Sequence, residues 1–312
     1  MLTLADVVQA RDRLNSYLHP TPLEPGLADQ VWFKLENANV THSFKIRGAL
    51  NAILALSNAA RARGVVTASS GNHAQGVAYA AHLAGVKAKI LMPEHTPRRK
   101  INGVCRYGAE AVLFGQNYDE TEAEALRLGR EHGLTFVSPY NDAAVIAGAG
   151  TIGLEILDKL PQVARVVVCV SGGGLISGVS MVIKSRKPSV EVIGVNATSA
   201  PAMYNYFYDK ALPQKWDTLA EALSGEIEKD SITLAMVKRY VDQMVLVSEE
   251  DIAAAMRWMV DEQGWMVEGG GAVGVAALLR GVLPLDGRPT AVVVSGGNVD
   301  GSTLRKVLLG LV

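Results

Sequence analysis

A lysine and three glycine-rich loops carry the residue types best suited to chemistry in this chain of 312 residues. Lys45 lies in the stretch SFKIRGALN, between the apolar side chains of Phe44 and Ile46. A lysine held among apolar groups has a lowered pKa, and its neutral amine can form a Schiff base with an aldehyde. Solvated lysines near helix starts are far more common, so Lys45 alone does not establish a reactive centre.

Three loops of small residues each follow an apolar run and precede a helical pattern. They are SSGNH (69–73), SGGGLISG (171–178) and SGGNVDG (295–301). In open α/β sheets, ligands bind at loops beyond the carboxyl ends of the strands. Consecutive glycines also let main-chain N–H groups converge on an anion at a helix N-terminus. The second loop is the best phosphate candidate, and a tight turn without a ligand is the alternative for any single loop.

The second loop does not match the common nucleotide motifs. A Walker loop needs Gly-Lys-Ser/Thr, which the sequence lacks. A dinucleotide fingerprint needs a glycine where this chain has Ser177 and an acidic residue where it has Asn196. A small phosphorylated aldehyde would use both a glycine loop and a reactive lysine. Pyridoxal 5'-phosphate is such a molecule, and we therefore expect it as the cofactor.

Composition and charge narrow the classes of protein. The chain has 30 basic and 31 acidic residues, and this balance gives no electrostatic reason to bind nucleic acid or an anionic membrane. It has no apolar signal-peptide core and no apolar run of roughly 18 residues. Cys105 and Cys169 are expected to be buried thiols in a reducing compartment. We expect a cytoplasmic protein with a small-molecule ligand and no bound metal.

Short apolar runs alternate with longer helical patterns, which predicts an α/β fold with mostly parallel strands. The predicted strands cover residues 64–69, 86–92, 109–114, 134–138, 165–170, 190–195, 243–248 and 290–295. One helical stripe after the first loop consists of Ala74, Val77, Ala78 and Ala81. Eight buried strands fit poorly in one sheet, so we expect two sheets and hence two lobes.

The chain also resembles a known family. The stretches SFKIRGALN, SSGNHAQGVAYAA, VIAGAGTIGLEI, SGGGLISG and SGGNVDG, in this order, are similar to those of the threonine dehydratase and serine racemase family. These are pyridoxal-phosphate enzymes of fold type II, with a tryptophan-synthase β-like architecture. The resemblance implies two lobes, each an open, mostly parallel sheet flanked by helices. Residues 1–49 and 141–312 would form the large domain, residues 50–140 a small domain inserted in it, and no C-terminal regulatory domain is expected.

The resemblance implies a role for each motif. Lys45 would form the Schiff base and remove the substrate α-proton, and Ser70 would face the opposite side of the cofactor as a second proton donor. The other cofactor-binding residues would be Phe44 beside the ring, Asn72 at its 3'-oxygen, Ser295 at its pyridine nitrogen, and Ser171, Gly172, Gly173, Gly174 and Leu175 around the phosphate. The substrate carboxylate would be bound by Ser69, Ser70, Gly71 and His73.

The implied reaction is the β-elimination of water from L-threonine or L-serine, giving 2-oxobutyrate or pyruvate and ammonia. Serine racemisation, 3-hydroxyaspartate dehydration and a non-catalytic relative are the alternatives. The resemblance also implies a homodimer or homotetramer. Racemases of the family hold a divalent cation through acidic residues, and here Asn196 and Ala202 occupy two of those positions, so that only Glu268 is left. Ala222 replaces a family glycine near the cofactor and is expected to alter the substrate pocket.

Overall fold

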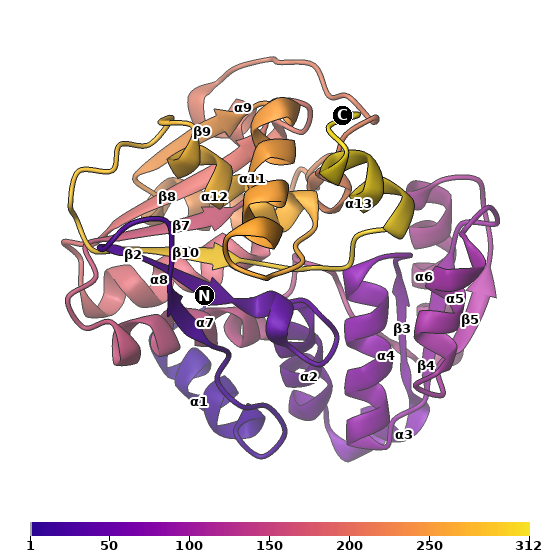
Figure 1. Ribbon diagram of the computed structural model, residues 1–312. Coiled ribbons are helices and arrows are strands. Elements are labelled where there is room, and N and C mark those ends of the chain that lie inside the picture. Colours follow the sequence, from indigo (N-terminus) through magenta and orange to yellow (C-terminus); the bar gives the residue numbers. More distant parts are fainter. Residues whose placement is uncertain (1) are drawn as a thin grey trace. The chain divides into compact units, whose positions relative to one another are not determined.

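The computed structural model describes residues 2–312, and its main-chain contacts divide the chain into two units (Figure 1). Unit 1 comprises the chain up to His19 together with Lys45–Ala149, and unit 2 comprises Pro20–Phe44 and Gly150–Val312. These bounds differ from the domains expected from the sequence, because the first 19 residues and the segment after Lys45 lie with unit 1. The division at residues 50 and 140 stays a prediction.

Unit 1 contains a parallel sheet with the strand order β5-β4-β3-β6. Its elements are α1 (Leu4–Leu14), α2 (Lys45–Ala55), α3 (Asn58–Arg63), β3 (Val65–Ala68), α4 (Asn72–Ala84), β4 (Ala88–Met92), α5 (Arg98–Cys105), β5 (Glu110–Leu113), α6 (Tyr118–His132) and β6 (Thr135–Phe136). Alternate residues of β3 and β4 enter two separate apolar clusters, one shared with α2 and α4 and the other with α6. Both faces of this sheet are therefore covered. The predicted stripe on α4 is confirmed, since all four of its residues are buried.

Unit 2 contains a six-stranded sheet with the order β1-β2-β10-β7-β8-β9, parallel except for β1 against β2. Its strands are β1 (Leu23–Pro25), β2 (Val31–Leu35), β7 (Arg165–Cys169), β8 (Glu191–Ala197), β9 (Gln243–Val247) and β10 (Thr290–Val294). Its helices are η1 (Glu36–Ala38), α8 (Gly174–Arg186), α9 (Ala202–Tyr208), η2 (Glu221–Leu223), α10 (Ile232–Tyr240), α11 (Glu249–Asp261), α12 (Gly269–Leu279) and α13 (Gly301–Leu308). Helix α7 (Ala143–Lys159) begins in unit 1 and ends in unit 2. Figure 1 shows α11 and α12 on one side of the sheet and α8 on the other.

All eight predicted strands are present, in two mostly parallel sheets as expected. The sequence analysis missed β1 and β2. Strand β2 contains Lys34, and this charged residue interrupts an otherwise apolar run that would have predicted a strand. The ammonium of Lys34 is buried, donates to Thr21 O at 2.8 Å and pairs with Glu155 at 2.5 Å. A buried lysine of this kind is tolerated because it is paired and hydrogen-bonded.

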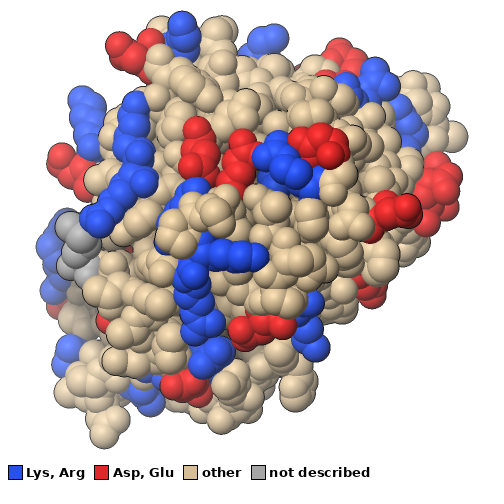
Figure 2. Space-filling model, turned by 90° about the vertical axis from the view of Figure 1, so that its left-hand side faces the viewer, with Lys and Arg blue, Asp and Glu red and all other residues tan. Residues whose placement is uncertain are grey.

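In the described part of the chain neither cysteine forms a disulfide, and the two differ in exposure. Cys169 is buried at the end of β7, as predicted. The prediction that Cys105 is buried is wrong, because this residue ends the short helix α5 on its exposed side. Among residues 2–312, no helix combines the length and the apolar character that crossing a membrane requires. On the face drawn in Figure 2, lysine and arginine side chains are interspersed with aspartate and glutamate, so opposite charges compensate over short distances.

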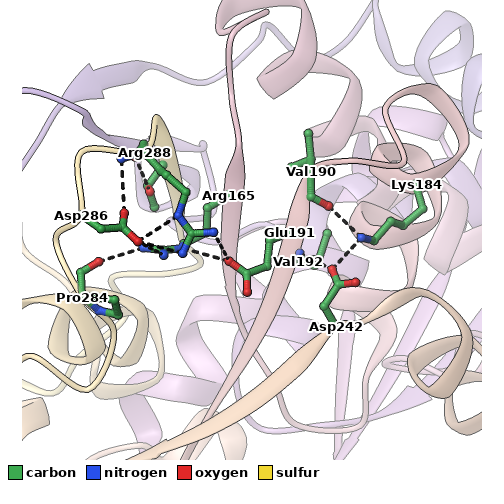
Figure 3. Close-up of polar contacts among 10 residues, drawn as sticks. Arg165, Lys184, Val190, Glu191, Val192, Asp242, Pro284, Asp286 and Arg288 are labelled. Carbon is green, nitrogen blue, oxygen red and sulfur yellow. Dashed lines mark hydrogen bonds and ion pairs between the residues drawn. The ribbon is translucent and has the colours of Figure 1, made fainter.

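Ion pairs hold the amino-terminal ends of the unit 2 strands together (Figure 3). Arg165, the first residue of β7, is almost fully buried and pairs with Asp286 at 2.8 Å and Glu191 at 3.3 Å. Arg288 contacts the same two carboxylates, each at 2.8 Å. Each carboxylate therefore bridges a buried and an exposed arginine. This arrangement satisfies the buried guanidinium, which also donates to Pro284 O at 2.9 Å.

The buried arginine should contribute strongly to stability. We expect Arg165→Met to lower the free energy of unfolding by about 3 kcal/mol, because it leaves two carboxylates partly unpaired next to an apolar side chain. Urea unfolding at pH 7 measures this change. Arg186→Met is the matched control: Arg186 is more exposed and pairs with Asp158 at 3.7 Å, so its loss should cost below about 0.5 kcal/mol. Equal costs for the two variants would contradict this account.

Candidate active site

Lys45 is the first residue of α2 and is partly buried in unit 1. Its amine donates a hydrogen bond of 2.8 Å to Pro139 O, in the loop that follows β6. Helix α4 approaches the main chain of Lys45 closely, since a Cβ at Gly76 would lie 3.1 Å from the Lys45 carbonyl carbon and 3.2 Å from Ile46 N. The glycine lets α2 and α4 pack at this distance. The chain thus fixes the amine from both its main-chain and its side-chain ends.

His73 is buried beside Lys45 in unit 1 and is held in one tautomer. Its Nε2 lies 2.9 Å from Val137 O, and a carbonyl oxygen only accepts, so Nε2 carries the proton and Nδ1 a lone pair. Among the described residues, this buried Nδ1 has no hydrogen-bond partner. Burial and, secondarily, the charge of Lys45 lower the pKa of His73 to about 3. The imidazole is therefore neutral at physiological pH.

The SSGNH loop connects β3 to α4, also in unit 1. Gly71 is the N-cap residue of α4 and no side chain caps the helix. Ser69 Oγ accepts from Gly71 N at 3.2 Å, and Asn72 opens the helix. Ser70 is partly exposed, and its side chain does not cap α4. The N-terminus of α4 thus has no side-chain cap, and a helix N-terminus of this kind favours an anion.

The glycine loop of unit 2 connects β7 to α8, as predicted. Gly172, Gly173, Gly174 and Leu175 are buried, and Ser171 is partly exposed. Gly173 is the N-cap residue of α8 with φ +88°, and a Cβ there would lie 2.7 Å from Met203 Cε. Only glycine fits both this φ and this space. No side chain caps α8, and within residues 2–312 the N–H groups of Gly172 and Gly173 have no protein acceptor.

The third loop of small residues is joined to the segment that precedes Lys45. Phe44 N donates to Ser295 O at 3.0 Å, and Gly297 N donates to His42 O at 2.9 Å. Ser43 and Gly296 form an isolated antiparallel bridge between these two bonds. Ser295 is buried at the end of β10. Main-chain hydrogen bonds in unit 2 therefore set Ser295 beside Phe44, which directly precedes Lys45 in the chain.

The structure shows the burial and contacts of the three residues discussed against the family pattern, Asn196, Glu268 and Ala222. Asn196 is fully buried, and its Nδ2 donates to Val170 O at 2.9 Å and to Ala200 O at 3.0 Å. Glu268 is buried before α12, and Ala222 is exposed, about 3.3 Å from where a Cβ of Gly270 would lie. Among the described residues, no group of three or more His, Cys, Asp or Glu side chains is placed to hold a metal ion.

The carbonyls that hold Lys45 and His73 were not found from the sequence. Val137 O and Pro139 O lie in one loop, and Val137 O also accepts from Thr67 Oγ1 at 2.8 Å. A main-chain acceptor leaves no mark in residue type or spacing. The serine and the proline of VSPYN (137–141) predict only a turn.

Comparisons with known proteins agree with this set of groups. A model of the pyridoxal-phosphate dependent enzyme family matches residues 14–296. The chain belongs to this family. It is 44% identical to an L-threonine ammonia-lyase of Thermotoga maritima, over 99% of this chain and 78% of that relative. Among solved structures, maize serine racemase has a TM-score of 0.90 at 31% identity, covering 99% of this chain and 98% of that one. A threonine deaminase of Solanum lycopersicum has a TM-score of 0.89 at 34% identity, covering 99% and 88%.

The residues present suit the cofactor of this pyridoxal-phosphate-dependent enzyme. Unit 2 has an uncapped helix N-terminus behind a loop in which Gly173 leaves no room for a side chain, which suits a phosphate. Unit 2 also provides the buried hydroxyl-bearing residue Ser295, and unit 1 provides the primary amine of Lys45. The predicted fold type II architecture and the predicted cofactor are thus confirmed by the family and its solved relatives.

The lowered pKa of His73 makes a prediction for stability against pH. Below pH 6.5 the unfolded chain binds a proton at this residue, whereas the folded protein does so only near pH 3. The folded state therefore loses stability as the pH falls through this window, by about 2 kcal/mol between pH 7 and pH 5 from this residue. His73→Gln retains a donor for Val137 O without the titration. Urea unfolding at both pH values should show a smaller loss in the variant; identical losses would rule the effect out.

Proposed function

We propose that the protein is an L-threonine ammonia-lyase, which converts L-threonine to 2-oxobutyrate and ammonia and acts on L-serine in the same way. The observation that carries the proposal is the amine of Lys45, placed at the start of α2 and directed by Pro139 O, in a chain with a threonine ammonia-lyase relative at 44% identity. The threonine deaminase among the solved relatives supports the same reaction class.

Each group has a proposed role in holding the cofactor. Lys45 is its covalent anchor, and the N–H groups from Ser171 to Leu175 bind its phosphate. Asn72 would bond the ring 3'-oxygen, Phe44 would pack beside the ring, and Ser295 would offer the ring nitrogen a neutral hydroxyl. When bound, pyridoxal phosphate supplies the electron sink that stabilises negative charge at the substrate Cα.

The chain's own residues have distinct tasks in the reaction. Lys45 takes the α-proton of the substrate as a general base. Ser69, Ser70, Gly71 and His73 belong to the loop at the uncapped start of α4, whose N–H groups and dipole bind the substrate carboxylate. The neutral His73 adds no second positive charge next to Lys45. Loss of the β-hydroxyl as water and hydrolysis of the released enamine then give the 2-oxo acid and ammonia.

A second activity, racemisation of serine, is favoured by one observation. Ser70 lies in the proposed substrate loop, is partly exposed and does not cap α4, which supports a role for its hydroxyl as a proton donor. Chiral analysis of serine recovered after partial turnover tests this role. D-serine that is lost in Ser70→Ala supports it, and a racemisation rate unchanged by that substitution contradicts it.

We also propose that the enzyme works in the cytoplasm as a homodimer or homotetramer. Two observations support this proposal. Neither cysteine takes part in a disulfide within residues 2–312, as is usual in a reducing compartment. The apolar side chains of Tyr206, Leu212 and Trp216 are exposed in unit 2, and exposed apolar groups of this size are common at protein interfaces.

The reaction can be tested through Lys45. Purified enzyme supplied with the cofactor should release 2-oxobutyrate from L-threonine and show a visible absorbance band. Lys45→Ala should lower the rate by about a thousandfold or more, because it removes both anchor and base. Lys89→Ala, at a partly exposed lysine paired with Glu110, should behave as wild type. Borohydride reduction and peptide mapping should place the cofactor on Lys45. Wild-type enzyme that releases no 2-oxo acid from threonine or serine would refute the lyase.

A further inference from the structure

A threonine from α10 contacts the glycine loop from the side. Thr233 Oγ1 lies 2.7 Å from Gly172 O, and this pair is buried. A carbonyl oxygen only accepts, so the threonine hydroxyl donates. Thr233 also packs closely against Gly173, since a Cβ on Gly173 would lie 3.0 Å from Thr233 Cβ. The same side chain therefore binds one glycine and excludes a side chain at the next.

A second hydroxyl orients the first. Ser231 Oγ lies 2.7 Å from Thr233 Oγ1 and also accepts from Thr233 N at 3.3 Å. The single proton of the Thr233 hydroxyl is already directed to Gly172 O, so Ser231 must be the donor in the contact between the two hydroxyls. Both side chains are buried. The two hydroxyls thus form a chain of hydrogen bonds with one direction, and each bond strengthens the next.

The planarity of the peptide bond transmits this contact to the phosphate loop. In a trans peptide, the C=O of one residue and the N–H of the next point in opposite directions. With Gly172 O held by Thr233, the N–H of Gly173 points away from α10. That N–H has no protein acceptor among residues 2–312, and it lies at the N-terminus of α8 where an anion is favoured. Without the hydroxyl, two adjacent glycines would leave this peptide free to rotate.

We infer that Thr233, oriented by Ser231, is a positioning residue that aims the Gly173 N–H at the phosphate group of the cofactor. The inference rests on the proposed role of residues 171–175 as the phosphate cradle. Thr233 itself does not touch the reacting atoms. Thr233 therefore affects the affinity only for a ligand that carries a phosphate. A residue that merely stabilised the fold would affect the affinity for every ligand of the site.

The test compares two aldehydes that differ only in the phosphate. Full-length enzyme freed of cofactor is titrated with pyridoxal 5'-phosphate and with pyridoxal, and binding is followed by absorbance. Thr233→Val keeps the shape of the side chain and removes its hydroxyl. It should weaken pyridoxal phosphate binding by about tenfold, which is the change in affinity that the loss of one net hydrogen bond produces. Pyridoxal binding should stay within about twofold of wild type. Thr233→Ser should restore the affinity.

Two further variants serve as controls. Thr290→Val removes a matched bond, from a buried threonine hydroxyl to Arg288 O at 2.8 Å, at the opposite end of the same sheet. It should change neither affinity. Ser231→Ala should show the phosphate-selective loss in weaker form, about threefold, and it provides a second route if Thr233→Val does not fold.

Each outcome decides a different claim. A Thr233→Val enzyme that loses affinity for both aldehydes equally, or for neither, overturns the positioning role. Wild-type enzyme that binds pyridoxal as tightly as pyridoxal phosphate overturns the assignment of the loop itself, and the inference with it. Neither result depends on lyase turnover, so the proposed reaction succeeds or fails separately, through 2-oxobutyrate formation.

Discussion

The main-chain hydrogen bonds between residues 41–44 and the loop at 295–298 are the constraint on which the site depends. Phe44 N bonds Ser295 O and Gly297 N bonds His42 O, while Asn298 Nδ2 donates to Thr41 O at 2.9 Å. His42 has φ +54°, a left-handed conformation that costs about 1 kcal/mol in a residue other than glycine. The surrounding bonds hold the chain in this conformation. They fix where the chain leaves unit 2, and Lys45 is the next residue.

Neither α4 nor α8 has a side-chain cap at its N-terminus. An N-cap side chain is normally worth about 1 kcal/mol to a helix, and α4 and α8 have glycine at that position. By contrast, α11 has a full capping box with Ser248 and Asp251, and α10 is capped by Ser231. The uncapped helices begin at the loops assigned to substrate carboxylate and cofactor phosphate. Anionic ligands would then take the place of caps, which couples ligand binding to local stability.

Local patterns in the sequence were sufficient to predict eight of the ten described strands, the two sheets and the glycine loops. Apolar periodicity and glycine at a strand end act over a few residues, so they can be read without tertiary contacts. Strand β2 could not be recognised, because Lys34 is compensated by Glu155, far away in the chain. The Thr233 hydroxyl donates to the main-chain carbonyl of Gly172, and the carbonyl of Pro139 accepts from Lys45. Every residue has a main-chain carbonyl, so residue type does not reveal these contacts. The burial of Cys105 was misjudged because a short helix exposes one of its faces.

The two ends of the unit 2 sheet differ in charge: one end has charged side chains and the other has uncharged polar groups. This difference suits the proposed ligand. At the amino-terminal ends, Arg165 and Arg288 share two carboxylates in a charged network. At the carboxyl ends of β7, β8 and β10, the chain presents uncharged groups: glycine N–H groups, the Asn196 amide and the Ser295 hydroxyl. A carboxylate there would repel a phosphate, and neutral oriented donors bind it without a buried counter-charge. In the proposed arrangement, the neutral hydroxyl of Ser295 at the ring nitrogen would not force its protonation. The ring would then be a weaker electron sink, and expulsion of a β-substituent would be favoured over other fates of the Cα charge.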